Sequence, residues 1–494
     1  MINSAATTGP DAGGARKSRM VLVTACLALF MSSLDNSVAN VALPAIGRDL
    51  HAGATQLQWV IDSYIVVRGA LLLTAGALSD RYGRRRMFQH GLLVFGAGSL
   101  LCSLATSPDL LVSARVLQAT GGCFLVPSSL ALVTDAYPDT GERARAIGIW
   151  SATTAVSTGL GPPLGGMLVE LAGWRSVFWI NVPLTVMAVA LAHRHAPAAG
   201  GDPTRRLDLL GQSLVAVALF AGTSAFIEST TAGWTAQAVV VMFVVAAAAT
   251  AAFAAAEARA RQPLLPLGLF RDTQFSAAAV VATTAFVIWA GFLFVNTLYL
   301  QDVRGYSPLT AGLLVVPATI GNLVLSPLSG RLTAARGPCL PVTVASIALL
   351  LGSLTLVLGV RTDRLAVLVI GYVLVGSGAG LVNAPITNAA LAGLPRGRAG
   401  VAGGVTSMFR QVGNALGVAL FGTLALSDLA PAARNRLLAG NVSRIASGDF
   451  VDGLQAAYLC AAGFAVLTLV AARVGFRDHP QEPAQSPESR ATAL

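Results

Sequence analysis

The stretch MVLVTACLALFMSSLDNSVANVAL, residues 20–43, decides the class of fold. It is apolar except for a few small polar side chains and a single acid, Asp35. An α-helix needs ~18 apolar residues or more to cross a lipid bilayer, and this run is longer than that. The polar residues before it and the buried acid within it are unlike a cleaved signal peptide. We therefore expect residues 20–43 to remain as a membrane span.

Runs of the same kind recur along nearly the whole chain. Of its 494 residues, 54% are hydrophobic and only 11% are charged, whereas soluble proteins carry about 25% charge. The runs are too long and too uniformly apolar for β-barrel strands, so α-helices are the expected spanning structure. The sequence predicts an all-α membrane protein with fourteen transmembrane helices, at 20–43, 56–78, 87–106, 110–134, 146–170, 176–193, 207–228, 235–257, 273–301, 308–332, 340–360, 364–392, 400–426 and 453–474.

The basic residues indicate the orientation of the chain. If the N-terminus is inside, two thirds of the 33 arginine and lysine residues fall on the cytoplasmic side, as the positive-inside rule requires. They are spread over many loops, which argues against a nucleic-acid surface. We expect a multi-pass protein of the cytoplasmic (inner) membrane with both termini in the cytoplasm.

A faint internal repeat predicts the domain organisation. The segment from Gly76 to Gly83 after the second run is echoed from Gly330 to Gly337 after the tenth. Such a repeat indicates two duplicated six-helix halves with a helix pair inserted between them. The predicted division is a cytoplasmic N-terminal tail 1–19, an N-terminal bundle 20–193, a cytoplasmic linker 194–206, two inserted helices 207–257, a C-terminal bundle 273–474 and a cytoplasmic C-terminal tail 475–494.

Four short motifs, in chain order, resemble those of a known transporter family. They are LDNSVANVALP at 34–44, GALSDRYGRRR at 76–86, RVLQ at 115–118 and GLGPPLGG at 159–166. Together they are similar to the motifs of the fourteen-helix drug:proton antiporters of the EmrB/QacA type, within the major facilitator superfamily. The resemblance runs from about residue 20 to 474. It implies the major facilitator fold and export of antibiotics or other small amphipathic compounds, energised by the proton gradient and without a cofactor.

Three charged residues within the runs are candidates for proton coupling. Counted at 1.5 Å per residue, Asp35, Asp62 and Arg115 lie in one layer near the outer surface. An ionised side chain at the bilayer centre costs at least ~2.5 kcal/mol, so embedded charges indicate function. Burial disfavours an ionised carboxylate and a nearby arginine favours it, so a carboxylate that approaches or leaves Arg115 would exchange protons as the conformation changes. The alternative is that all three only hold the bundle together.

A second group of residues is assigned to the substrate cavity. Arg68 lies near the midplane of the second run, where it either attracts an anionic cargo or neutralises Asp62. Arg410 and Gln411 in the thirteenth run resemble a pair found in the family, and Gln118 ends the fourth-helix motif. We expect Arg68, Gln118, Arg410 and Gln411 to line the substrate cavity, with a polar contact between helices as the alternative for Arg410 and Gln411.

Two motifs predict moving parts. Asp80 stands at the negative, C-terminal end of the second run, where a helix N-terminus or Arg84 must compensate its charge. The resemblance implies a conformational latch, assigned to Gly76, Asp80, Arg81, Gly83 and Arg84. In the fifth run the glycines provide a smooth face and the prolines a bend. This antiporter motif comprises Gly159, Gly161, Pro162, Pro163, Gly165 and Gly166.

Two other classes of function are alternatives. A proton-coupled importer would share the fold, but the fifth-helix motif and the inserted pair argue against it. A membrane-embedded enzyme would cluster His, Cys or acidic residues on one face, whereas the five histidines lie in loops, span ends and the tail. No GxxxxGK[ST] motif for ATP is present, and no metal-ligand spacing joins the five cysteines. The expected partners are a small-molecule substrate, protons and membrane lipid, but no nucleic acid, and the chain is expected to act as a monomer.

Overall fold

The computed structural model describes residues 12–197, 208–260, 267–362, 364–392, 399–426, 429 and 444–476. Within these ranges the chain consists of helices joined by short turns. The elements are α1 (Ala12–Leu50), α2 (Ala54–Tyr82), α3 (Arg84–Ser103), α4 (Pro108–Ala136), α5 (Thr140–Ala172), α6 (Ser176–Trp179), α7 (Asn181–His195), α8 (Leu209–Ala232), α9 (Gln237–Arg259), η1 (Leu267–Arg271), α10 (Thr273–Leu298), η2 (Tyr299–Val303), α11 (Pro308–Arg336), α12 (Cys339–Thr362), α13 (Leu365–Ala392), α14 (Ala399–Leu426) and α16 (Arg444–Gly475).

Each predicted run coincides with a helix, but several boundaries differ, and α16, for example, begins at Arg444, before the predicted start at 453. α1 begins at Ala12, before the predicted start at 20, because backbone hydrogen bonds continue a helix past the end of its apolar stretch. The run 176–193 is divided into α6 and α7 at Ile180. Pro183 explains this break, since its ring lacks an N–H and clashes with the carbonyl four residues earlier. Residues 1–11, 198–207 and 477–494, which hold most of the predicted tails and linker, lie outside the described ranges.

Fewer helices qualify as membrane spans than the fourteen that were predicted. Ten helices in the described ranges are long and apolar enough to cross a membrane, and the bent pair Ala54–Leu72 and Thr74–Tyr82 in α2 would make eleven. α3, α5 and α14 are not among them. On their outer faces, many of the helices expose apolar side chains such as Val186, Leu313 and Leu354, as expected of contact with lipid. The chain is thus an all-helical, multi-pass membrane protein.

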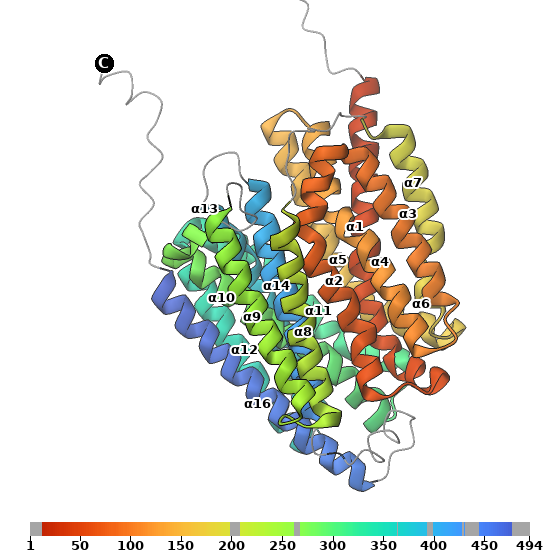
Figure 1. Ribbon diagram of the computed structural model, residues 1–494, viewed down its shortest axis with the longest axis vertical. Coiled ribbons are helices and arrows are strands. Elements are labelled where there is room, and N and C mark those ends of the chain that lie inside the picture. The colour runs from red at the N-terminus through yellow and green to blue at the C-terminus, as the bar shows by residue number, and fades with distance from the viewer. Residues whose placement is uncertain are drawn as a thin grey trace, which may run out of the picture.

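The helices form two groups that lie side by side (Figure 1). In the first, α1 packs against α4, α5 and α7, while α3 and α2 pack against α4. In the second, α13 packs against α11 and α12, α10 against α14, and α16 against α12. The groups meet where α5 lies along α11 and where α2 lies along α14. We call these two contacts the α5–α11 seam and the α2–α14 seam.

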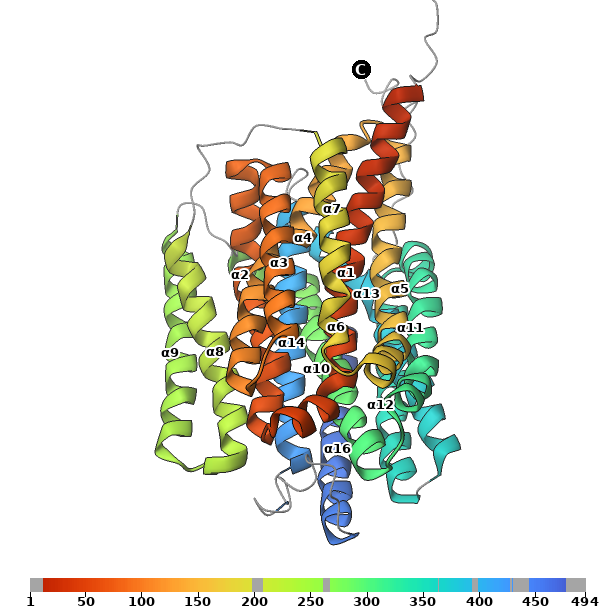
Figure 2. The ribbon, with the colours of Figure 1, turned by 90° about the vertical axis from the view of Figure 1, so that its right-hand side faces the viewer.

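The pair α8 and α9 lies at one edge of the molecule, outside the two groups (Figure 2). α8 contacts both α2 and α14. Thr74 of α2 donates a hydrogen bond to Gln212 of α8, and Thr423 of α14 donates to the carbonyl of Phe226 in α8 at 2.8 Å. α8 therefore runs along the α2–α14 seam and touches both groups.

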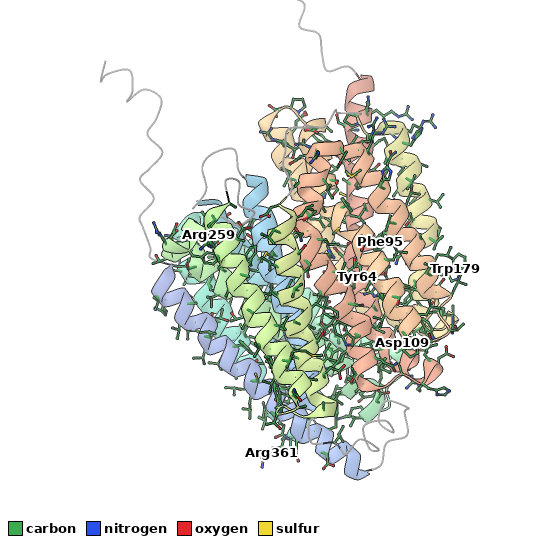
Figure 3. The ribbon with its side chains drawn as sticks, viewed as in Figure 1. Tyr64, Phe95, Asp109, Trp179, Arg259 and Arg361 are labelled. Carbon is green, nitrogen blue, oxygen red and sulfur yellow. The ribbon has the colours of Figure 1, made fainter. Side chains whose placement is uncertain are left out.

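The molecule has two ends, which we call proximal and distal. The proximal end holds the start of α1 and the turn at Gly83 between α2 and α3; the distal end holds the turn 51–53 between α1 and α2. Tyr64 and Phe95 are buried within the helices, whereas Asp109 and Arg361 are exposed at helix ends (Figure 3).

Candidate functional site

A buried ion pair joins α1 to α4 inside the first group. Arg115 donates from Nη1 to Asp35 Oδ2 at 2.5 Å. Arg115 is 0% exposed and Asp35 is 2% exposed. The guanidinium also donates from Nε to the carbonyl of Val60 at 3.1 Å and lies 4.3 Å from the ring centroid of Tyr64. Arg115 therefore links α1, α2 and α4 at one point.

Neutral side chains complete the surroundings of Asp35. Its Oδ1 accepts hydrogen bonds from Gln118 Nε2 and Asn181 Nδ2, both at 2.8 Å. Ser99 Oγ accepts from the same two amides, at 3.1 and 3.0 Å, and donates to the carbonyl of Phe178 at 2.9 Å. Gln118 Oε1 in turn accepts from Arg115 at 2.8 Å. We call Asp35, Ser99, Arg115, Gln118 and Asn181 the polar network.

Glycines bring the helices of the polar network close together. A side chain at Gly98 would collide with the backbone of Gln118, and one at Gly121 with the backbone of Phe95. Small residues of this kind let helix backbones approach closely in membranes. The close α3–α4 contact places Ser99 beside Gln118.

Sequence reasoning missed two members of the network and placed a third elsewhere. Ser99 carried no signal, because a serine in an apolar run is common. Asn181 lies within the apolar run 176–193, and no role was assigned to it. Gln118 was assigned to the cavity, but the structure buries it inside the first group, against Asp35.

Asp62 lies in different surroundings. It is 0% exposed, and in the described part of the chain neither carboxylate oxygen has a hydrogen-bond partner. At about 100° per residue, Asp62 shares one face of α2 with Gln58 and Gly69. A side chain at Gly422 of α14 would collide with Gln58, and one at Gly69 would lie 3.0 Å from Gln411 Cβ of α14. Asp62 is thus placed on the face of α2 that lines the α2–α14 seam.

Arg68 and Arg410 stand on the two sides of the same seam. Arg68 does not form an ion pair with Asp62; its guanidinium lies 5.8 Å from the Tyr64 ring centroid. Arg410 donates to the carbonyl of Asn383 and to Thr387 Oγ1, both at 3.2 Å. Gln411 accepts a hydrogen bond from Asn414 at 3.1 Å.

The predicted latch residues lie at the proximal end. Arg84 lies 3.6 Å from Asp80 and 2.5 Å from Asp135 at the end of α4. Asp135 was not anticipated, because only the fold brings the end of α4 to this turn. Gly83 has φ 99°, a left-handed conformation that favours glycine. Gly76 faces Pro127 of α4, and the guanidinium of Arg81 lies 5.5 Å from the ring centroid of Tyr82.

The glycine and proline motif of α5 lies between α1 and α11. Side chains at Gly161 and Gly165 would collide with Ser37 and Val38 of α1, and one at Gly166 with Pro308 and Leu309 at the start of α11. In return, Gly312 of α11 packs against the carbonyl of Pro162. Pro163 follows within the same helix, and Gly159 faces Thr319 of α11. The motif builds the α5–α11 seam near the distal end.

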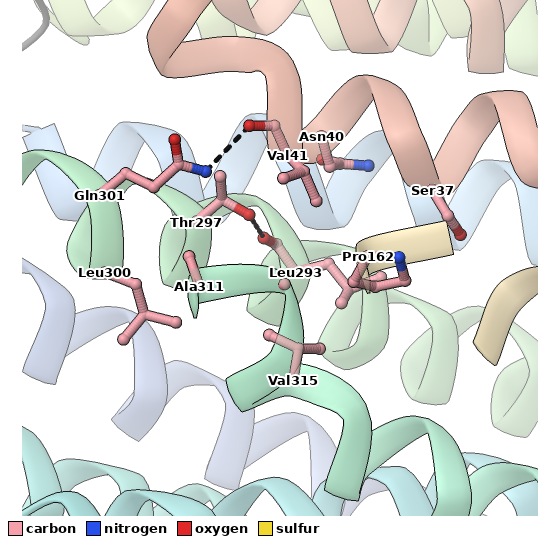
Figure 4. Close-up of a pocket in the computed structure, with 11 residues that line it drawn as sticks. Ser37, Asn40, Val41, Pro162, Leu293, Thr297, Leu300, Gln301, Ala311 and Val315 are labelled. Carbon is pink, nitrogen blue, oxygen red and sulfur yellow. Dashed lines mark hydrogen bonds between the residues drawn. The ribbon is translucent and has the colours of Figure 1, made fainter. Parts of the chain in front are cut away.

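A small pocket opens where the two groups meet (Figure 4). Its lining comes from α1, α5, α10, η2 and α11 and is mostly apolar. Gln301 donates to the carbonyl of Val41 at 2.9 Å. The residues that line it are Ser37, Asn40, Val41, Pro162, Leu293, Thr297, Leu300, Gln301, Ala311, Gly312 and Val315.

The distal end also carries charged and polar bonds between the groups. Arg48 of α1 lies 3.3 Å from Asp302 of η2, and the backbone N–H of Leu309 donates to Glu170 of α5 at 3.3 Å. The side chain of Asp302 is fully buried. Among the described residues, no group of three or more His, Cys, Asp or Glu is arranged to hold a metal ion.

Comparison with known proteins identifies the family of the chain. The model of the Major Facilitator Superfamily matches residues 25–418. The chain is 38% identical to the multidrug resistance protein Stp of Mycobacterium tuberculosis, covering 83% of this chain and 76% of that protein. It is 34% identical to the methylenomycin A resistance protein of Streptomyces coelicolor, covering 85% and 89%.

A solved structure shares the fold. It is a bacterial homologue of the human lysosomal transporter Spinster in an inward-facing, unoccupied conformation, with a TM-score of 0.63 and 17% identity. The match covers 94% of this chain and 98% of that one. The chain therefore belongs to the major facilitator superfamily, in the group that contains these resistance proteins, and is a membrane transporter, not an enzyme.

Proposed function

We propose that this protein exports antibiotics or other small amphipathic compounds across the cytoplasmic membrane in exchange for protons. The names of its relatives describe resistance to drugs, which supports export as the direction of transport. The proton-coupling part rests on one observation: Asp62 is fully buried without a hydrogen-bond partner in the described structure, on the face of α2 that lines a seam between the two groups.

The location of Asp62 explains how a proton is tied to movement. An ionised carboxylate buried without partners is costly, so in this conformation the site holds its proton. Rocking of the two groups separates α2 from α14, exposes Asp62 to water and allows the proton to exchange. A group that is sheltered in one conformation and wet in the other couples protons to alternating access.

The polar network couples the same movement of α2 to α1 and α4. Arg115 holds the carbonyl of Val60, two residues before Asp62, so a shift of this turn of α2 moves the guanidinium relative to Asp35. In the conformation described here Asp35 is held by Arg115. We assign Asp62 to proton exchange, and Asp35 with Arg115 to the coupling of α1, α2 and α4.

The remaining features fit one transport cycle. The hydrogen bonds from Arg48 to Asp302, Gln301 to Val41 and Leu309 to Glu170 close the distal end, which we assign to the outside. The structure then represents the state that is closed to the outside, and both termini lie in the cytoplasm. We propose fourteen spans, counting α2, α3, α5 and α14, in a protein that works as a monomer in membrane lipid. The contact of Arg84 with Asp80 and Asp135 is the latch that changes between states.

A susceptibility panel tests this function. An efflux-deficient bacterial host expressing the wild-type chain should survive higher concentrations of at least one antibiotic than the empty host. Asp62→Asn should abolish that protection, whereas Asp109→Asn, at an exposed aspartate of the distal end, should preserve it. Protection that persists in Asp62→Asn would refute proton coupling through Asp62. Accumulation of the compound in everted vesicles would identify an exporter, whereas accumulation in vesicles of the native orientation would identify an importer.

A further inference from the structure

Arg68 and Arg410, at the α2–α14 seam, have no counter-charge among the described residues. Arg115, by contrast, is buried against a carboxylate. Within the described part of the chain, no carboxylate lies within ion-pair distance of Arg68 or Arg410. In each, the Nε is buried without a hydrogen-bond partner. Both side chains are only partly exposed, and a charge in such surroundings is stabilised when an opposite charge binds beside it.

The two arginines are brought together by a contact between their neighbours. Gly69 of α2 packs directly on Gln411 of α14, and a side chain at Gly69 would lie only 3.0 Å from Gln411 Cβ. Arg68 and Arg410 each precede one of these contacting residues. The α2–α14 seam therefore carries one guanidinium from each group of helices at nearly the same level.

Each guanidinium turns from the seam toward its own group. Arg68 lies 5.8 Å from the ring centroid of Tyr64, whose hydroxyl lies beside Gly122 of α4. Arg410 lies 5.4 Å from the ring centroid of Phe286 and contacts Asn383 and Thr387 of α13. Aromatic faces and neutral oxygens orient a guanidinium without offsetting its charge, and they leave the buried Nε groups free to donate.

We propose that the exported compound is an organic anion whose carboxylate draws Arg68 and Arg410 away from these contacts and is bound between them. This inference rests on the proposed export function and adds a substrate class to it. Planar guanidinium groups match a carboxylate through paired, charge-assisted hydrogen bonds. The ring of Phe286, which is partly exposed, supplies apolar surface for the body of the compound. Because the two arginines come from opposite sides of the seam, the anion is held by both groups at once.

Matched pairs of small compounds test the substrate class. The purified full chain in lipid nanodiscs would be titrated with benzoate and benzamide, 1-naphthoate and 1-naphthamide, and 4-phenylbutyrate and 4-phenylbutyramide, with binding followed by calorimetry. At least one carboxylate should bind about tenfold or more tightly than its amide. Arg68→Gln and Arg410→Gln should each remove most of that preference.

Further variants separate charge from structure. Arg68→Lys and Arg410→Lys retain the charge and should recover part of the preference, and Arg145→Gln, at an exposed arginine of α5, should leave it unchanged. If no carboxylate in the panel binds better than its amide, or if the preference survives in the Arg68→Gln/Arg410→Gln double variant, the proposal is wrong. Binding is measured without a proton gradient, so failure here is distinguishable from failure of proton-coupled export.

Discussion

Asp35 and Asp62 are both buried aspartates of the first group, yet their surroundings are opposite. Asp35 accepts hydrogen bonds from Arg115, Gln118 and Asn181. Asp62 has no partner for either oxygen among the described residues. The first aspartate lies inside one group of helices, and the second lies at a seam between two groups.

This difference separates two uses of an acid within a membrane. A carboxylate that is paired and hydrogen-bonded holds helices together, and its loss leaves buried partners uncompensated. A carboxyl group without partners contributes little to stability but is free to exchange a proton when its surroundings change. We therefore propose a structural role for Asp35 and proton exchange for Asp62.

The largest expected effect comes from breaking the Asp35 site. Asp35→Ala leaves Arg115 buried without its counter-charge, and removal of one partner of a buried ion pair costs about 3–5 kcal/mol. The variant should show a strongly lowered melting temperature in detergent, together with a low yield of folded chain. A melting temperature equal to that of the wild type would mean that Arg115 does not depend on Asp35, and the contrast with Asp62 would fail.

A second change tests whether this loss comes from charge. The double variant Asp35→Asn/Arg115→Gln removes both charges and keeps polar side chains of similar size. Because neutral replacement of a whole buried pair is often tolerated, the double variant should be more stable than Asp35→Ala. A double variant as unstable as the single one would show that shape, not charge, governs the site.

An intermediate effect is expected where the two groups touch at the distal end. Gly166→Ala places a methyl group against Pro308, and overpacking of a tight contact typically costs about 1–3 kcal/mol. The variant should favour the state in which α5 and α11 separate. When combined with Ser37→Cys as a reporter, it should make the new thiol more reactive toward thiol reagents. Gly148→Ala in the same helix, where nothing lies within 4 Å, is the matched control. Equal reactivity in both variants would contradict the assignment of this seam.

A smaller effect on stability is expected at Asp62. Asp62→Asn removes no hydrogen bond of the described structure, so its unfolding free energy should stay within about 1 kcal/mol of the wild type. Thermal unfolding of the purified chain measures this. A destabilisation as large as that of Asp35→Ala would show that Asp62 has a structural partner and would erase the difference between the two sites.

The smallest effect is expected at the proximal latch. Arg84 and its partners Asp80 and Asp135 are each partly exposed, and ion pairs of this kind contribute about 0.2–1 kcal/mol. Arg84→Gln should therefore barely change the melting temperature. It should, however, lower the rate at which everted vesicles accumulate the exported compound. An unchanged rate would remove the latch from the transport cycle.

Much of the fold was predictable because apolar runs and breaks leave a direct trace in sequence. The fourteen predicted runs all fall on helices, and the motifs identified the superfamily correctly. The number of crossing helices was less accessible, because α3, α5 and α14 fall short of the apolar character expected of a span and α2 is bent by 53°. Pro183 shows a further limit: its effect on the break between α6 and α7 was not anticipated from the length of the run.

The candidate site was harder to predict, because the sequence gives the depth of a residue along its helix but not the direction in which its side chain points. Counting residues placed Asp35, Asp62 and Arg115 in one layer, but the pairing depends on which face of each helix they occupy. Asp35 meets Arg115, whereas Asp62 lies on a face of α2 toward α14. Partners such as Asn181 and Asp135 come from helices distant in sequence, and only packing brings them near.

The most direct test of proton exchange at Asp62 is infrared absorption of the full chain in lipid bilayers. A protonated carboxyl group absorbs separately from a carboxylate, so each aspartate can be followed by difference between variants. The account predicts that the protonated-carboxyl absorption is reduced in Asp62→Asn and retained in Asp35→Asn. Reduction in Asp35→Asn together with retention in Asp62→Asn would contradict it.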